Sequence, residues 1–304
     1  MKKKILIITS DPESINYEIL KKSLFFFKKK NKNKYIFIGS KKLFYNNIKL
    51  PKNNNFDFID IKYDNKKNIK TYLQNSFEKA FEIIDKKNAD GIINLPLNKK
   101  NFFNYNYPGV TEYISSKFDC EKKTTMLLFS DKFSVSPITT HYKITKIVKN
   151  LNKEKIIQNF YNIKFFYQKI IGIKNPKIGL LGLNPHNGID FKRPQEEDLF
   201  IKPALNKLKK NKNNKIFGLL SPDSSFLEIK RKNLNSLIGH YHDQVLTTFK
   251  YINEFNAINI TLGLPFLRVS PDHGTGLNIL GKNKANPDSF IYALNFYEKY
   301  SDNL

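Results

Sequence analysis

The chain of 304 residues has very little cysteine and no long apolar run. Its single cysteine, Cys120, cannot form an internal disulfide, which favours a reducing compartment such as the cytoplasm. No apolar run approaches the roughly 20 residues that cross a bilayer, and the apolar stretch near the start ends at Ile8, which is too short for a signal peptide. We therefore expect a cytoplasmic protein without a membrane partner.

Two common nucleotide-binding sequences are missing as well. There is no Walker A sequence, and no G-x-G-x-x-G leads from an expected strand into a helix. Any nucleotide must therefore be held in some other way.

Arginine is scarce, although the formal net charge is +25. Only Arg193, Arg231 and Arg268 are present, and lysines are scattered among asparagine, isoleucine and phenylalanine. A nucleic-acid-binding protein is expected to gather basic residues on one face and to use arginine for phosphate contacts. The composition instead reflects AT-rich codons, so the charge predicts no nucleic-acid partner.

Strand-like and helix-like segments alternate along the chain, which favours mostly parallel sheets covered by helices. The expected strands are 5–8, 35–39, 91–97, 124–129, 133–140, 177–183, 216–220, 236–241 and 257–264. The expected helices are 12–29, 69–85, 144–169, 196–210 and 288–300. The polar stretch 53–67 predicts a surface loop.

Three histidines each follow a short apolar run that predicts a buried strand leading into a helix: His141, His186 and His242. The carboxyl ends of parallel strands meet at one edge of a sheet, where ligands bind. Three imidazoles there could hold one divalent metal and leave other positions open for a substrate. The sequence thus predicts a catalytic metal site, and His240 is interpreted as a packing residue.

Several motifs occur in one order along the chain. Tyr241-His-Asp-Gln244 is followed at regular spacing by Lys250, Asn259 and Arg268. Upstream lie Pro96-Leu-Asn-Lys99, Gly109-Val-Thr-Glu112, Thr139-Thr-His141 and Asn184-Pro-His-Asn-Gly188. Over nearly the whole chain, this set resembles the 4-hydroxythreonine-4-phosphate dehydrogenases, metal-dependent NAD enzymes of pyridoxal phosphate biosynthesis.

The resemblance assigns roles to these residues. It implies that one divalent ion (Zn, Co or Mg) is bound by His141, His186 and His242, the last from the partner subunit of a homodimer. It implies substrate contacts from Thr111, Lys250, Asn259 and Arg268. Lysine and arginine suit a phosphate and a carboxylate. The general base stays open between Asp243 and Lys99.

A second segment, 273–287, resembles the adenosine-binding loop of isocitrate and isopropylmalate dehydrogenases. The cofactor-binding residues implied for NAD or NADP are His273, Gly274, Thr275, Gly276 and Asn286. The fold implied is α/β, with two α/β/α-type domains and a cleft between them, and it is not a Rossmann fold. We expect one domain over 1–118 plus 265–304 with the cofactor loop, and a second over 119–264 with the metal ligands and dimer contacts.

Three places depart from the family pattern. Ser10–Asn16 lacks the glycines of the loop after the first strand, Val110 replaces a histidine, and 189–193 replaces a glutamate and a Gly-rich stretch. The expected reaction is oxidation of 4-phosphohydroxy-L-threonine to a β-keto acid that loses carbon dioxide to give 3-amino-2-oxopropyl phosphate. The alternatives are a sister dehydrogenase for a phosphorylated threonate- or erythronate-type sugar acid and a non-catalytic, decayed homologue.

Overall fold

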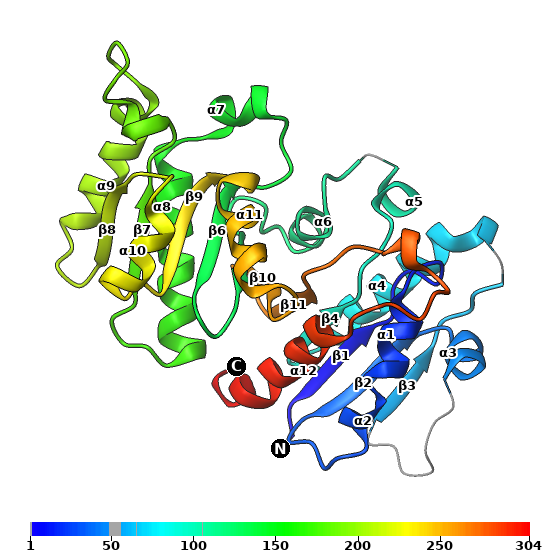
Figure 1. Ribbon diagram of the computed structural model, residues 1–304. Helices are drawn as coiled ribbons and strands as arrows, with labels where there is room; N and C mark the ends of the chain where they lie inside the picture. The colour runs from blue at the N-terminus through cyan, green and yellow to red at the C-terminus, as the bar shows by residue number, and fades with distance from the viewer. Residues whose placement is uncertain (1, 49–55, 65, 105) are drawn as a thin grey trace. The chain divides into compact units, whose positions relative to one another are not determined.

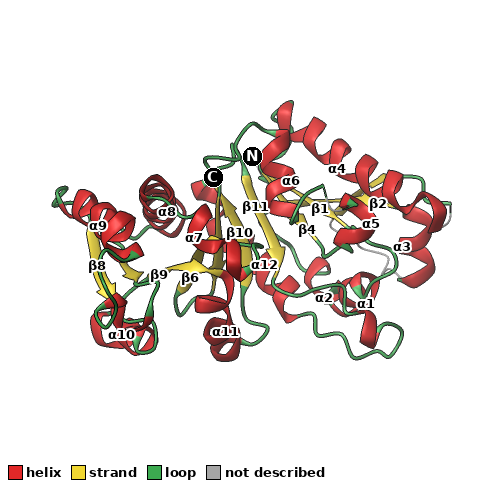
Figure 2. Cartoon of the chain, turned by 90° about the horizontal axis from the view of Figure 1, so that it is seen from above, coloured by secondary structure: helices red, strands yellow, loops and turns green. Residues whose placement is uncertain are grey.

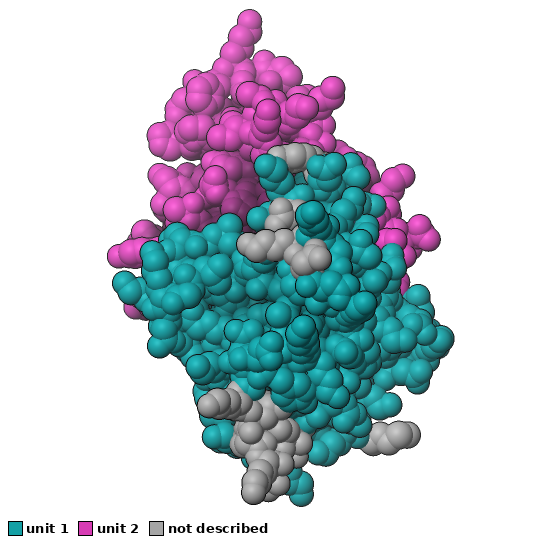
Figure 3. Space-filling view, turned by 90° about the vertical axis from the view of Figure 1, so that its right-hand side faces the viewer, with its two compact units in different colours: residues 1–110, 255–259, 265–304 teal, residues 111–254, 260–264 magenta. Residues whose placement is uncertain are grey.

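The computed structural model describes residues 2–48, 56–64, 66–104 and 106–304. The chain forms two compact units (Figure 3). Unit 1 comprises residues 1–110, 255–259 and 265–304, and unit 2 comprises 111–254 and 260–264. The division into two domains that we expect from the sequence stays a prediction.

Unit 1 is a parallel sheet with the strand order β3-β2-β1-β4-β11 (Figure 1). The strands are β1 Lys4–Ile8, β2 Lys34–Gly39, β3 Phe56–Asp60, β4 Gly91–Asn94 and β11 Leu267–Pro271. The helices are α1 Asn16–Lys22, α2 Leu24–Phe27, α3 Lys41–Asn47, α4 Ile69–Asp85, α5 Lys99–Phe103 and α12 Asp288–Tyr300. Figure 2 shows α4 on one face of this sheet and α1 and α2 on the other. The strands are therefore buried on both sides, as a parallel sheet requires.

An aromatic cluster fills the outer part of unit 1. The ring of Phe37 lies 5.3 Å from that of Phe27 and 4.8 Å from that of Phe56, between centroids. The prediction of a surface loop is wrong for 56–60, which form β3, while 53–55 and 65 lie outside the described residues. The sequence there alternates, so that Phe56 and Phe58 face the cluster and Asp57 forms an exposed ion pair with Lys34 at 2.6 Å.

Unit 2 has the strand order β5-β6-β9-β7-β8. Among the described residues, the pair β5–β6 is antiparallel and the other three pairs in this order are parallel. Its strands are β5 Thr125–Phe129, β6 Ser134–Thr139, β7 Lys177–Leu181, β8 Lys215–Leu220 and β9 Ser236–Tyr241, and β10 Ile258–Leu262 has residues in both units. Its helices are α6 Val110–Lys117, which begins at the last residue of unit 1, α7 Ile147–Asn150, α8 Lys153–Phe166, α9 Lys202–Lys209, α10 Ser225–Lys232 and α11 His242–Asn253. Figure 2 shows α8 and α9 on one face of the sheet and α10 and α11 on the other.

Two predicted helices are interrupted. The helix expected over 144–169 contains the separate helices α7 and α8, because Asn152 is extended and its side chain caps α8 by accepting a hydrogen bond from the Lys155 amide at 2.8 Å. The helix expected over 12–29 starts only at Asn16 and breaks at Ser23 between α1 and α2. Among the described residues, every helix is too short or too polar to traverse a bilayer.

Candidate active site

The three predicted metal ligands lie at the carboxyl ends of three adjacent strands of unit 2. His141 follows β6, His242 is the first residue of α11 directly after β9, and His186 lies in the turn after β7. Strand β9 pairs with both β6 and β7. The rings of His141 and His242 in one chain are 5.9 Å apart between centroids. The fold thus brings two of the three imidazoles together and places the third beside the neighbouring strand end.

Each of these imidazoles has a carboxylate beside its Nδ1 atom. The distances are 2.6 Å from His242 to Asp243, 2.7 Å from His186 to Asp190 and 3.6 Å from His141 to Glu112. A carboxylate in this position favours the tautomer that carries its proton on Nδ1 and leaves the lone pair on Nε2.

This donor set fits a metal bound through Nε2, which is the usual arrangement of histidine ligands in proteins. Within the described part of a single chain, no three histidine, cysteine, aspartate or glutamate side chains gather closely enough to hold an ion. The metal assignment, in which His242 comes from a partner subunit, therefore stays a prediction.

Glu112 on α6 is a functional candidate that sequence reasoning did not single out. Its Oε1 accepts a hydrogen bond from the Thr140 hydroxyl at 2.6 Å. Burial opposes its ionisation, but contacts with His141 and Thr140 outweigh that effect and lower the pKa of Glu112 to about 2. Its Oε2 is buried and has no hydrogen-bond partner among the described residues. Glu112 is thus a fixed anion beside His141.

A hollow of about 270 Å³ adjoins His186 in unit 2. It is lined by Leu183, Pro185, His186, Pro222, Asp223, Tyr241 and Gln244. Four of these residues belong to the histidine motifs: Pro185, His186, Tyr241 and Gln244. The motifs therefore border a space that could admit part of a ligand.

The predicted substrate-binding residues differ in their surroundings. Thr111 is buried in α6, with its hydroxyl 3.3 Å from that of Thr261. Lys250 is exposed on α11, seven residues after Asp243 and so on the same side of the helix. Asn259 has a buried Oδ1 atom with no hydrogen-bond partner among the described residues. That acceptor suits a ligand with an N–H or O–H group.

Arg268 and Lys99 both lie in unit 1. Arg268 is only 3% exposed and donates from Nε to the side-chain oxygen of Asn94 at 2.7 Å. Lys99 begins α5 and donates from Nζ to the Pro108 carbonyl at 3.2 Å. Arg268 is therefore fixed in orientation by its neighbour on β4.

Comparison with known proteins identifies the family. The family model described as pyridoxal phosphate biosynthetic protein PdxA matches residues 6–297. The chain belongs to this family. A 4-hydroxythreonine-4-phosphate dehydrogenase from Sulfurihydrogenibium sp. (strain YO3AOP1) is 35% identical, over 96% of this chain and 96% of that protein. The family expected from the motifs is confirmed.

Solved structures agree on the fold. A 4-hydroxythreonine-4-phosphate dehydrogenase from Klebsiella pneumoniae matches with a TM-score of 0.79 at 23% identity, covering 97% of this chain and 98% of that one. An isocitrate dehydrogenase from Methylococcus capsulatus matches with a TM-score of 0.52 at 11% identity, covering 97% and 85%. The expected α/β fold of the isocitrate dehydrogenase type, which is not a Rossmann fold, is confirmed.

The predicted cofactor loop of this PdxA-family chain packs against the loop that has lost the family's glycines. The Thr275 carbonyl accepts a hydrogen bond from the Ile15 amide at 3.1 Å. Gly276 has a φ of 59°, and a Cβ there would lie 2.7 Å from the Ile15 side chain. The left-handed backbone at this position favours glycine, and a Cβ here would crowd the Ile15 side chain.

An ion pair on α1 holds the segment that precedes Asn286. Lys22 donates to the carbonyls of Asn283 and Ala285 at 2.9 and 2.8 Å, and Glu18 accepts from the Ala285 amide at 2.6 Å. Glu18 and Lys22 are themselves 2.8 Å apart. The Asn286 side-chain oxygen accepts a hydrogen bond from the Asp288 amide at the start of α12, so the side chain's hydrogen-bond donor is its NH₂ group.

The interpretation of His240 as a packing residue agrees with its surroundings. It is fully buried, and its Nε2 lies 2.7 Å from the Leu181 carbonyl oxygen. Burial lowers the pKa of His240 to about 4, so the ring is neutral near pH 7.

Proposed function

We propose that this PdxA-family chain catalyses the NAD- or NADP-dependent oxidation of 4-phosphohydroxy-L-threonine with the help of one divalent metal (Zn, Co or Mg). The product is a β-keto acid, which loses carbon dioxide to give 3-amino-2-oxopropyl phosphate. The observation that carries the proposal is that His141, His186 and His242 each lie at the end of a strand and each have a carboxylate beside Nδ1. Membership of the family supports the substrate class.

In this proposal, the metal, the cofactor and the side chains each have a separate role. When bound, the metal would supply Lewis-acid polarisation of the substrate hydroxyl, and the nicotinamide would accept the hydride. Lys250 and Arg268 would bind the phosphate and carboxylate of the substrate by charge-assisted hydrogen bonds. Asn259 would accept a hydrogen bond from the substrate's amino group, because its buried Oδ1 needs a donor.

The proton of the substrate hydroxyl needs an acceptor. Asp243 and Lys99 remain the candidates. Asp243 already contacts His242, and its side chain is 75% exposed, so it could pass a proton to water. Lys99 has a carbonyl partner in Pro108. These contacts favour Asp243.

A homodimer is part of the proposal. Large apolar side chains are exposed beside two of the predicted ligands, at Tyr142 and Ile144 after His141 and at Ile189 and Phe191 after His186. An apolar surface of this kind is typical of a protein interface. We propose that a second copy of the chain covers this surface and contributes its His242. We place the protein in the cytoplasm, as the single cysteine predicts.

The test is reconstitution. The protein is stripped with a chelator, and Zn, Co or Mg is added back with 4-phosphohydroxythreonine and NAD or NADP. We expect the appearance of reduced cofactor to depend on added metal. A protein that binds metal but oxidises no substrate would support the decayed homologue, and one inactive with every metal would contradict the proposal.

A sister activity on a phosphorylated threonate- or erythronate-type acid is the second candidate. Val110, at the start of α6, stands where the family has a histidine and removes a polar group next to Thr111. Relative kcat/KM values for the amino-bearing and hydroxyl-bearing substrates decide between the two.

A further inference from the structure

The turn that carries His186 has an unusual backbone. Three successive residues have positive φ: His186 at 48°, Asn187 at 58° and Gly188 at 71°. Residues other than glycine adopt this region only when the surrounding structure imposes it. Some group near the turn must therefore hold it in place.

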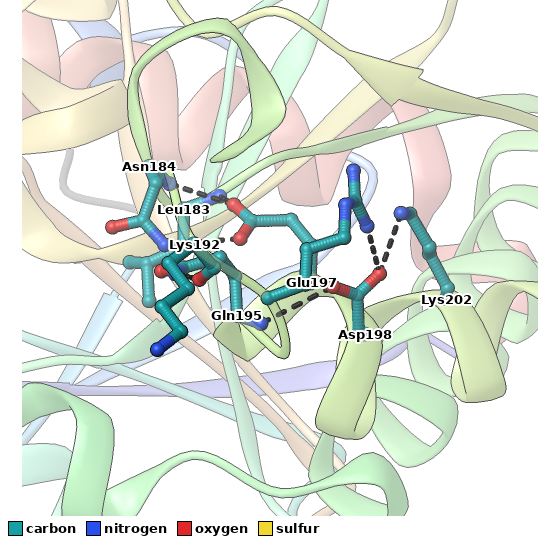
Figure 4. Close-up of polar contacts among 8 residues, drawn as sticks. Leu183, Asn184, Lys192, Gln195, Glu197, Asp198 and Lys202 are labelled. Atoms are coloured by element: carbon teal, nitrogen blue, oxygen red, sulfur yellow. Dashed lines mark hydrogen bonds and ion pairs between the residues drawn. The ribbon is translucent and has the colours of Figure 1, made fainter. Parts of the chain in front are cut away.

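Glu197 contacts both ends of this turn. Glu197 is fully buried. Its Oε1 accepts hydrogen bonds from the backbone amides of Leu183 at 2.9 Å and Asn184 at 2.7 Å (Figure 4). Its Oε2 accepts from the Asn184 side-chain amide at 2.9 Å. At the other end, a Cβ on Gly188 would lie only 2.8 Å from this same Oε2.

The carboxylate is held by its own segment. Asp198, the next residue, accepts from Lys202 at 2.7 Å and from the Gln195 amide at 3.1 Å, and it also pairs with Arg193. Burial opposes ionisation of Glu197, but the hydrogen bonds from Asn184 and Leu183 outweigh it and lower the pKa of the carboxyl group. A buried carboxylate whose bonds come from backbone amides fixes the position of those amides.

We propose that Glu197 is a positioning residue, which holds the turn 183–188 and thereby directs the His186 imidazole toward the metal. This inference rests on the proposed function, in which His186 is a ligand. Sequence reasoning did not single out Glu197, because its partners lie 13 and 14 positions away and only the fold brings them together.

The experiment compares three variants of the full-length protein. Glu197→Met keeps the volume and removes every acceptor, and Glu197→Gln keeps one acceptor oxygen for the two backbone amides. Glu196→Met is the matched control, since Glu196 contacts only the Asn184 side chain in this turn, at 2.8 Å. Co²⁺ and Zn²⁺ affinities are measured by competition with a chromophoric chelator, and thermal unfolding in excess chelator checks that each variant is folded.

We expect Glu197→Met to bind metal roughly 10- to 100-fold more weakly, the loss typical when a residue that orients a ligand is removed. Glu197→Gln should lose less, and Glu196→Met should stay within about twofold of wild type. Wild-type affinity in a folded Glu197→Met protein would overturn the inference, and so would equal losses in Glu197→Met and Glu196→Met.

A readout without metal separates this inference from the proposed function. Hydrogen exchange at the amides of Leu183 and Asn184 should be faster in Glu197→Met than in wild type, with no change in Glu196→Met. If wild type binds no metal, the proposed function fails, and the exchange rates still decide whether Glu197 holds the turn. Unchanged exchange in Glu197→Met would refute that role.

Discussion

The imidazoles of His141 and His242 lie 5.9 Å apart, between ring centroids, within one chain. This proximity bears on the proposed homodimer, because the family resemblance takes His242 from the partner subunit. Mixing two inactive variants can decide which histidine crosses the interface. In a hybrid dimer, one site is intact only when both substitutions fall in the other site.

We predict that His141→Ala and His242→Ala are each inactive and that mixing them after subunit exchange restores about a quarter of wild-type activity, because half of the dimers are hybrids with one intact site of two. Mixing His141→Ala with His186→Ala is the control and should restore nothing. Recovery in the control alone would show that His186 crosses the interface instead, and recovery in neither mixture would place all three ligands in one chain.

Much of the fold could be predicted from the sequence. The residues 69–85, 236–241 and 288–300 form α4, β9 and α12 with the expected bounds, because long periodic patterns and short apolar runs with clear ends determine them. Strand β3 was not predicted, since Phe56–Asp60 is brief and lies in an Asn- and Lys-rich stretch. Its stability comes from aromatic contacts with Phe37 and Phe44, which are distant in sequence.

The candidate site, like the fold, could be predicted only in part from the sequence. The motifs identified the histidines, but Asp190 was noted only as a departure from the family and Glu112 only as part of a motif. Glu112 meets Thr140 across 28 positions of sequence, a contact that no local pattern encodes. The sequence signal for Glu112 is its place directly after Thr111 in the motif Gly109–Glu112.

Glu112 provides the next prediction. Glu112→Gln should weaken metal binding about tenfold, because an amide stabilises the Nδ1-protonated form of His141 less well than a carboxylate does. The control is Glu121→Gln, at an exposed residue outside these contacts, which should leave the affinity unchanged. Metal competition titrations measure both. A folded Glu112→Gln protein with wild-type affinity would show that Glu112 does not act on the ligand.

The aromatic cluster of unit 1 predicts a large effect on stability. Phe37→Ala should lower the free energy of unfolding by about 3–5 kcal/mol, because Phe37 is 1% exposed and its removal leaves a cavity among four other rings. Phe25→Ala is the matched control, since that ring is 48% exposed, and it should change stability by less than about 0.5 kcal/mol. Urea unfolding followed by circular dichroism compares them, and similar values for the two variants would contradict the packing argument.

The ion pair on α1 predicts a defect confined to the cofactor. Lys22→Met removes the donor to the Asn283 and Ala285 carbonyls, so the segment before Asn286 should become less ordered in the free protein. Binding NAD or NADP would then require ordering this segment, and we expect KM for the cofactor to rise about tenfold with kcat nearly unchanged.

Lys21→Met, one position earlier on α1 and exposed, is the control. Metal affinity should be normal in both variants, because their changes lie in unit 1 and the three histidines lie in unit 2. An equal KM for cofactor in Lys22→Met and wild type would show that 273–287 does not bind the nucleotide or does not need this support, and direct NAD titration by fluorescence would tell which of the two holds.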